Sequence, residues 1–149
     1  MDYSKLNFVD CDDPQKAVDI IIRDWSASKK ASVINFIYYS NFILLKKDAD
    51  YLKSLQLSDK ILIDGIGMQL YFNITKGIWP TNLNGTDLSP MLLSTLDAQN
   101  TPIALYGTTN ESIQKAKINI SKYLKNKRIY YIRDGFNNLE WNKIQQNTV

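Results

Sequence analysis

The feature that most constrains the fold is a short apolar run that ends on an acid and two closely spaced glycines. Lys60–Ile63 has the apolar, β-branched composition of a buried strand, and Asp64-Gly65-Ile66-Gly67 follows it directly. A helical pattern then spans Gly65–Lys76 and stops at Gly77. Since a strand, a glycine turn and a helix in this order form most of a βαβ unit, this stretch predicts a parallel sheet.

The same alternation of strand and helix repeats along the chain. Further strands are predicted from β-branched and aromatic content over Val33–Tyr39, Ile103–Tyr106 and Arg128–Ile132. Four further helices are predicted. The first starts at Pro14 with Asp13 as its cap, and the second spans Asn41–Leu57. The third starts behind Thr86 or Asp87 as its cap, and the fourth runs from a Thr109 or Asn110 cap to about Lys125. The alternation predicts a Rossmann-like α/β fold, an open and mostly parallel sheet with helices on both faces.

The composition fits one domain of this kind. The chain has 149 residues, of which 44% are hydrophobic, and we expect a single domain over 1–149 with a polar tail at 137–149. Met1–Asp13 lacks the basic start and the apolar core of a secretory signal. Ala31–Leu45, the longest uncharged stretch, is too short and too polar to span a bilayer, so we expect a cytoplasmic protein.

The last quarter of the chain is basic. Residues 112–149 carry the surplus of Lys and Arg behind the net charge of +3. These side chains either form the solvated face of a helix or attract phosphate or anionic lipid headgroups. The basic side chains of Lys115–Arg128 are not accompanied by a motif that stacks on nucleobases, so no nucleic-acid partner is predicted.

The chain contains no histidine, which removes several classes of site at once. Ser-His-Asp and Cys-His nucleophile systems, histidine general bases and most zinc sites are excluded. The single cysteine, Cys11, excludes an intrachain disulfide and fits a reducing compartment. Acid–base chemistry near neutral pH must therefore use carboxylates, Tyr, Lys or Cys11, and neither a metal nor a cofactor is predicted.

Four residues end predicted strands of the sheet: Tyr39, Asp64, Gly107 and Asp134. The loops at the carboxyl ends of parallel strands share one edge, so we expect these residues to line a common crevice. Asp64 is the best-placed base, because a carboxylate between an apolar strand and a glycine turn should be partly desolvated. A structural role for Asp64, in the turn or as a helix cap, is the alternative.

Two other acidic patterns have simpler explanations. Asp87 follows Thr86 at a helix start, where capping alone would explain it. Asp48-Ala49-Asp50 resembles the metal-binding D-x-D of many sugar-nucleotide transferases, but it falls inside the helix predicted over Asn41–Leu57. A solvated helix face is therefore the better interpretation of this triplet.

Three motifs together resemble a known family. Leu62–Gly67, Asn84–Pro90 and Ile103–Gly107 are similar in order and spacing to the PDGIG, G-T/S-D-L-x-P and VFLLGG patterns of the WecG/TagA/CpsF glycosyltransferases, over about residues 4–136. The resemblance implies an inverting, metal-independent transferase that moves an N-acetylhexosamine-type sugar from a UDP-sugar to a lipid-linked (polyprenyl diphosphate) acceptor. Such enzymes act in the synthesis of teichoic acids, enterobacterial common antigen or capsular polysaccharide.

The resemblance also assigns roles to residues. Asp64 matches the aspartate proposed as the catalytic base, which takes the proton of the acceptor hydroxyl as that oxygen attacks the anomeric carbon. Helix N-termini after Gly65 and Gly107 would stabilise the leaving diphosphate. The residues expected to bind substrate are Tyr39, Gly65, Gly67, Thr86, Asp87, Gly107 and Asp134. The lipid acceptor implies peripheral contact with the inner face of the membrane. An exposed sheet edge or apolar patch would favour association of the chain with itself, so a homo-oligomer is an open alternative.

The chain departs from the family pattern at several positions. Ile37 and Tyr39 stand where the family commonly has Thr and Asn, and its usual arginine falls near Asn82. Thr108 replaces a second glycine, and Asp134 replaces a histidine. The family also continues beyond the length of this chain with a segment that helps to form the donor nucleotide site. Two hypotheses therefore stay open: a transferase, present as its N-terminal part or as a short member, and a degenerate, non-catalytic paralogue that acts at most as a binding or interaction module.

Overall fold

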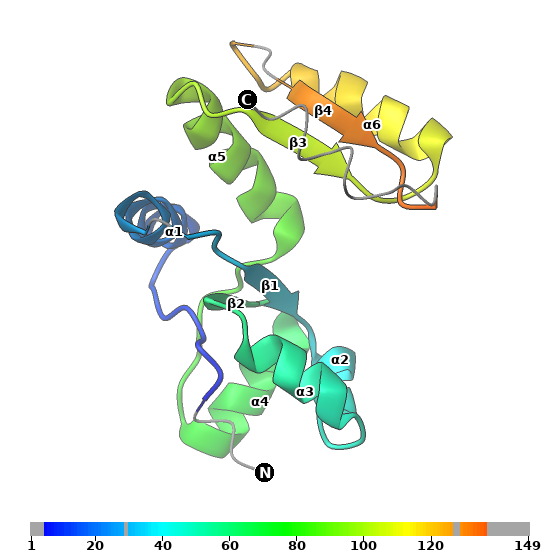
Figure 1. The fold of residues 1–149 in the computed structure, drawn as a ribbon. Coiled ribbons are helices and arrows are strands. Elements are labelled where there is room, and N and C mark those ends of the chain that lie inside the picture. The colour runs from blue at the N-terminus through cyan, green and yellow to red at the C-terminus, as the bar shows by residue number, and fades with distance from the viewer. Residues whose placement is uncertain (1–4, 29, 127–128, 137–149) are drawn as a thin grey trace. The chain divides into compact units, whose positions relative to one another are not determined.

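The computed structural model describes residues 5–28, 30–126 and 129–136 (Figure 1). The chain divides into two compact units, Met1–Leu92 and Leu93–Val149, and each is described by itself. Both units combine helices with short parallel strands, so the predicted α/β class is confirmed. The expected single domain stays a prediction, and the polar tail at 137–149 lies outside the described residues.

The sheet of the first unit is centred on β2 (Lys60–Ile63), which has the predicted bounds. On one side β1 (Ile34–Ile37) pairs with it in parallel, from Ile34 opposite Lys60 to Ile37 opposite Ile63. On the other side Phe8 forms a parallel bridge with Ile61, supported by a hydrogen bond from the Val9 N–H to the Ile61 carbonyl at 2.9 Å. The chain around Phe8 was not predicted as part of the sheet, because one bridge is too short to leave a strand pattern in the sequence.

Helices cover both faces of this sheet, as predicted. Ile61 and Ile63 contribute to one core and Leu62 to another, because successive residues of a strand face opposite sides. The first core also contains residues of α2 (Tyr39–Leu44), α3 (Ala49–Gln56) and α4 (Ile66–Lys76), which Figure 1 shows together on one side of β1 and β2. The second core contains residues of α1 (Pro14–Ala27) and of the start of α5 (Gly85–Ala98).

The ends of α1 and α4 follow the signals in the sequence. Asp13 caps α1 by accepting hydrogen bonds from the N–H groups of Gln15 and Lys16 at 2.6 and 3.3 Å, and Pro14 is the first helical residue. Gly77 ends α4 in the left-handed conformation, with φ of 66°. Local capping chemistry therefore sets these boundaries.

The single helix predicted over Asn41–Leu57 is wrong. The structure has α2 and α3 there, separated by a turn, and Asp48 caps α3 by accepting a hydrogen bond from the Tyr51 N–H at 2.8 Å. A side chain that accepts a hydrogen bond from the backbone amide three residues later starts a new helix, even though the apolar periodicity that favoured one long helix continues through it. Asp48-Ala49-Asp50 consequently begins a helix and does not lie within one.

The second unit contains β3 (Ile103–Tyr106), α6 (Asn110–Ser121) and β4 (Ile129–Arg133). The two strands pair in parallel with an irregularity between Ile103 and Ala104, and Thr109 caps α6. The helix ends before Lys125. Asp97 fixes the chain that follows it, because its carboxylate is buried and accepts hydrogen bonds from the N–H groups of Lys125 and Asn126 at 2.7 and 3.0 Å.

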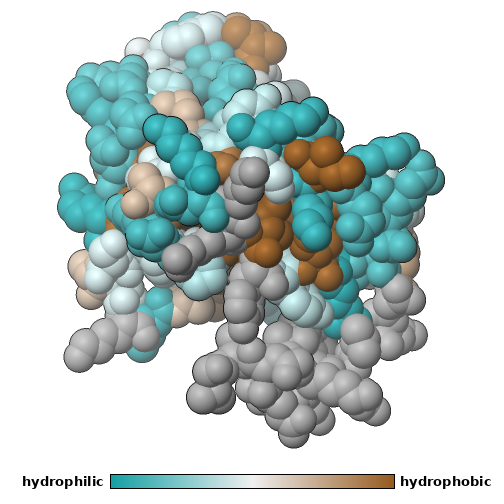
Figure 2. Space-filling model, turned by 90° about the horizontal axis from the view of Figure 1, so that it is seen from above, coloured by the Kyte–Doolittle hydropathy of each residue, from teal (hydrophilic) through white to brown (hydrophobic). Residues whose placement is uncertain are grey.

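Within the described residues, strand pairing is divided between the units, with β1 and β2 in one sheet and β3 and β4 in another. None of the described helices is long and apolar enough to cross a membrane. The face shown in Figure 2 carries hydrophobic side chains in separate areas between hydrophilic ones.

Candidate active site

The carboxyl edge of the first sheet brings two predicted site residues together. β1 ends at Ile37 and β2 at Ile63, so Tyr39 and Asp64 follow neighbouring parallel strands. The Asp64 N–H donates to the Ile37 carbonyl at 2.9 Å, which fixes the start of the turn against the end of β1. This edge is the place where open α/β sheets bind ligands.

The carboxylate of Asp64 is half-buried and has neither a hydrogen-bond nor an ion-pair partner among the described residues. It is not a helix cap, since α4 begins behind Gly65 without a side-chain cap bond. The structural alternative is therefore supported by the backbone bond of Asp64 to Ile37 and by no side-chain contact in the described part of the chain. A half-buried carboxylate that is not engaged elsewhere is able to accept a proton from a bound molecule.

Gly65 gives the turn its shape. Its φ of 84° and ψ of 161° lie in a region that only glycine occupies readily. The Gly65 N–H donates to Oδ1 of Asn82 at 2.7 Å, so the side chain of Asn82 holds the turn from the loop after α4. The sequence identified Asn82 only as the position near which the family's arginine falls, and no pattern predicted this contact.

Gly67 has a packing role. A Cβ atom at this position would lie 2.8 Å from the Cβ of Tyr39, which is closer than two non-bonded carbon atoms normally approach. Gly67 therefore lets α4 pack directly on α2, with the Tyr39 side chain at the contact. Its predicted role in substrate binding remains a prediction.

The second motif starts α5, and its capping residue differs from the prediction. Asn84, and not Thr86 or Asp87, accepts the hydrogen bond that caps the helix, from the Asp87 N–H at 2.9 Å. Asn84 Nδ2 also donates to Oδ2 of Asp87 at 2.7 Å, a reciprocal arrangement like a capping box. Asp87 and Thr86 are exposed, and the one described bond of the Asp87 carboxylate is this structural one.

Two predicted site residues lie together in the second unit. Gly107, with φ of 127°, follows β3, and Asp134 follows the neighbouring strand β4. The Gly107 N–H donates to the Arg133 carbonyl at 3.0 Å, and Gly135 approaches Gly107 so closely that its Cβ would lie 3.1 Å from the Gly107 Cα. Asp134 Oδ1 accepts a hydrogen bond from the Phe136 N–H at 3.1 Å.

The predicted site residues thus form two groups. Tyr39, Asp64, Gly65, Gly67, Thr86 and Asp87 belong to the first unit, whereas Gly107 and Asp134 belong to the second. A crevice shared by both groups stays a prediction. In the described part of the chain, no three Cys, Asp or Glu side chains are grouped so that they could hold a metal ion.

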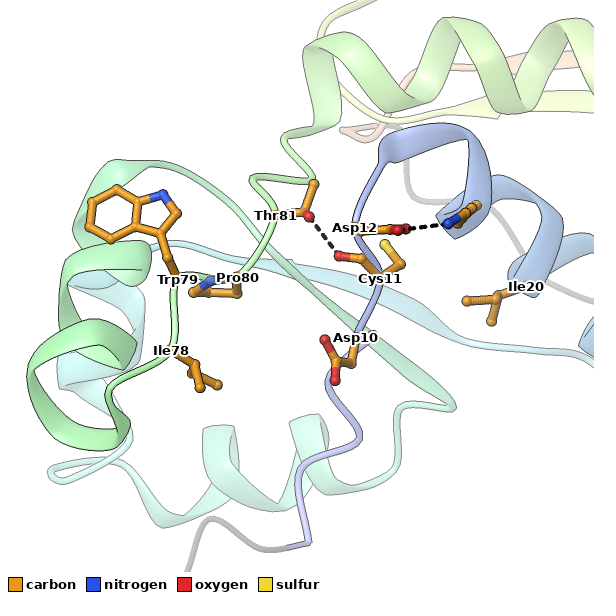
Figure 3. Close-up of a pocket in the computed structure, with 9 residues that line it drawn as sticks. Asp10, Cys11, Asp12, Ile20, Ile78, Trp79, Pro80 and Thr81 are labelled. Atoms are coloured by element: carbon orange, nitrogen blue, oxygen red, sulfur yellow. Dashed lines mark hydrogen bonds and ion pairs between the residues drawn. The ribbon is translucent and has the colours of Figure 1, made fainter.

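A pocket opens in the first unit at the same edge of the sheet (Figure 3). One wall is formed by Asp10–Asp12 with Lys16 and Ile20 of α1, and the other by Ile78–Thr81. The first wall follows the Phe8 bridge, which runs parallel to β2, so it leaves the sheet on the side of Asp64. The sequence did not predict this pocket, because its walls are joined by folding across a long sequence separation.

Two contacts define the chemistry of the pocket. Thr81 Oγ1 donates to the Cys11 carbonyl at 2.6 Å and joins the walls, as Figure 3 shows. The hydrogen bond from Lys16, at 2.7 Å, lowers the pKa of Asp12. Burial raises the pKa of the Cys11 thiol, which favours the protonated form over the thiolate.

Two comparisons with known proteins show what the chain is similar to. A family model described as "Glycosyl transferase WecG/TagA/CpsF family" matches residues 4–148. The N-acetylglucosaminyldiphosphoundecaprenol N-acetyl-beta-D-mannosaminyltransferase of Bacillus subtilis (strain 168) is 27% identical over 119 residues, which are 80% of this chain and 46% of that relative. The chain thus spans about half the length of the relative. Because the family model matches almost the whole chain, the protein belongs to the WecG/TagA/CpsF family of glycosyltransferases.

Proposed function

We propose that this chain carries the catalytic base of an inverting glycosyltransferase that acts in cell-surface polysaccharide synthesis. The observation that carries the proposal is the Asp64 carboxylate, half-buried at the carboxyl end of β2 and without a partner among the described residues. Family membership supports the reaction class, and the position of Asp64 supports its role as the base.

In the proposed reaction, Asp64 removes the proton of an acceptor hydroxyl group. The hydroxyl oxygen attacks the anomeric carbon of the donor sugar, the bond from that carbon to the diphosphate oxygen breaks, and the configuration inverts. The Gly65 N–H donates to Oδ1 of Asn82 at 2.7 Å, so it is engaged within the turn. The N–H groups of Ile66 and Gly67, in the first turn of α4, lack intrahelical acceptors and are the donors that this helix end offers.

The relative and the family support a proposal for the substrates. The relative is named for an acceptor linked to diphosphoundecaprenol and for an N-acetylmannosaminyl group. For this chain we propose a UDP-linked N-acetylhexosamine as donor and a polyprenyl diphosphate saccharide as acceptor, which places the protein at the inner face of the membrane. The pocket between Asp10–Asp12 and Ile78–Thr81 lies at the edge that carries Asp64 and offers space for a sugar.

One observation favours a second function. The chain has Ile37, Tyr39, Thr108 and Asp134 where the family pattern has a Thr, an Asn, a second glycine and a histidine, which supports a member that binds a substrate without turning it over. A non-catalytic module that binds the lipid-linked saccharide or a larger partner is the alternative.

The test is transfer from a UDP-N-acetylhexosamine to a short-chain polyprenyl diphosphate saccharide. We expect Asp64→Asn to lower turnover by about 10²- to 10⁴-fold, since it removes the base and keeps the shape of the side chain. Asp50→Asn is the matched control, because Asp50 is exposed on α3 and pairs only with the exposed Lys53 in the described structure. Circular dichroism checks that both variants keep the fold.

The outcomes separate the two functions. Unchanged turnover of Asp64→Asn would remove Asp64 from the mechanism. If the unsubstituted chain shows no turnover and isothermal calorimetry detects no heat with UDP at millimolar concentration, the non-catalytic module is the better account.

A further inference from the structure

The outer side of α4 is an exposed apolar stripe. Ile66, Leu70 and Ile74 follow one another at intervals of four residues, so they lie on one side of the helix. Their exposed fractions are 60, 44 and 80%, whereas Met68 and Phe72 of the same helix are buried in the core. A helix that is already anchored by its inner side does not need this second apolar side for folding.

The neighbouring helix extends this surface. α2 is in contact with α4, and Gly67 of α4 touches Tyr39 of α2. Ile43 and Leu44 of α2 are exposed, whereas Leu45, directly after α2, is buried.

The charges on these helices are of one sign. Neither α2 nor α4 contains Asp or Glu, whereas Lys46 and Lys47 follow α2 and Lys76 ends α4. The nearest acids in the sequence are Asp64, two residues before α4, and Asp48, which directly follows Lys47 and caps α3. Exposed apolar side chains on helices that contain no acids, with lysines at or just beyond the helix ends, fit a surface that lies on an anionic bilayer.

We propose that the outer surface of α2 and α4 docks the protein on an anionic lipid bilayer. The inference rests on the proposed function, because an acceptor with a polyprenyl chain remains in the membrane while its sugar reaches Asp64. α4 begins two residues after Asp64, so a bilayer under α4 brings the lipid headgroups next to the proposed base. The lysines distinguish this surface from an interface with an uncharged apolar protein face.

The experiment is flotation with vesicles of phosphatidylcholine, with and without phosphatidylglycerol, and without any sugar substrate. We expect binding to the anionic vesicles that weakens with salt. Leu70→Ser with Ile74→Ser should lower the partition coefficient about tenfold or more, since two exposed apolar side chains no longer enter the interface. Replacing Lys46, Lys47 and Lys76 by Gln should lower it about fivefold for each lysine at low salt.

Two controls are matched to these variants. Leu57→Ser removes an apolar side chain that is as exposed as Ile74, at 80%, but that follows α3. This substitution should leave vesicle binding unchanged. Lys117→Gln with Lys122→Gln tests the basic last quarter of the chain, and it should have little effect. A loss of binding from this pair, with none from the α4 pair, would assign the membrane contact to the second unit and overturn the proposal.

Two further results would also overturn it. The first is the absence of binding to anionic vesicles. The second is a self-association, seen by light scattering, that Ile74→Ser abolishes while vesicle binding is unaffected, because the stripe would then be a protein interface. Asp64→Asn should bind vesicles like the unsubstituted chain. The vesicle assay therefore tests docking even if the transferase proposal fails, and the transfer assay tests Asp64 even if docking fails.

Discussion

At the scale of single residues, the turn that presents Asp64 depends on Gly65 and Asn82. We expect Gly65→Ala to lower the free energy of unfolding by about 1–3 kcal/mol, because alanine is strained at φ of 84° and ψ of 161°. No atom lies within 4 Å of the added Cβ, so the cost comes from the backbone and not from a clash. Urea denaturation measures it, and an unchanged midpoint would show that the turn adopts another shape.

The hydrogen bond of Asn82 can be tested separately. Asn82→Ala leaves the partly buried Gly65 N–H without its acceptor, which should cost about 1–3 kcal/mol of stability. Asn73→Ala is the control, since Asn73 is exposed on α4 and alanine favours a helix. Equal effects of the two substitutions in urea denaturation would refute the role of Asn82 in holding the turn.

Thr108 stands where the family pattern has a second glycine, and the backbone conformation at this position favours glycine. Its φ of 54° is left-handed, which costs a residue with a branched side chain about 1–2 kcal/mol. We expect Thr108→Gly to raise the free energy of unfolding by about 1 kcal/mol through relief of this strain. The greater conformational entropy that glycine gives the unfolded chain offsets part of this gain. A lower melting temperature for this variant would show that the Thr108 side chain stabilises the loop by more than its backbone strain.

At the scale of elements, an ion pair joins α1 to β2. Lys60 Nζ lies 2.7 Å from Oδ2 of Asp24, and its hydrogen bond lowers the pKa of Asp24, with a smaller contribution from Arg23. The folded-state pKa is thus below that of the unfolded chain. The pair therefore stabilises the protein above the ordinary Asp pKa of about 4, and this contribution is lost as the pH falls through the lowered value.

A double-mutant cycle of Asp24→Asn and Lys60→Met tests this pair. The coupling energy from urea denaturation should be favourable at pH 7 and should decrease as the pH falls below about 4. It should also shrink at high salt, because both side chains are partly exposed. A coupling energy that is constant from pH 7 to pH 2 would contradict the assignment.

The elements also show what the sequence could predict. β2, β3 and the end of α4 were predicted at their observed residues, because strand composition, Gly77 and the flanking turns are local signals. The split between α2 and α3 was missed, since the apolar periodicity continues through Asp48. The pairing of Phe8 with Ile61, the bond of Asn82 and the pocket wall at Asp10–Asp12 join distant segments, and no local pattern encodes them.

At the scale of the whole molecule, the two extended clusters of buried side chains lie within the first 92 residues. One surrounds Ile61 and Ile63, and the other surrounds Leu62 and extends to Leu88 and Leu92 of α5. The second unit is smaller, and its described buried apolar residues are few: Ile103, Ile113 and Leu124. Burial of apolar area is the main source of stability, so the first unit should fold without the second.

A fragment of residues 1–98, which ends with α5, tests this expectation. We expect a cooperative urea transition and a helical circular dichroism spectrum, because both faces of the sheet keep their helices. Leu62→Ala in this fragment should cost about 2–5 kcal/mol, since Leu62 is fully buried on the face covered by α1 and α5. A fragment that remains unfolded would mean that α5 requires the second unit, and the turn that presents Asp64 would then depend on the entire chain.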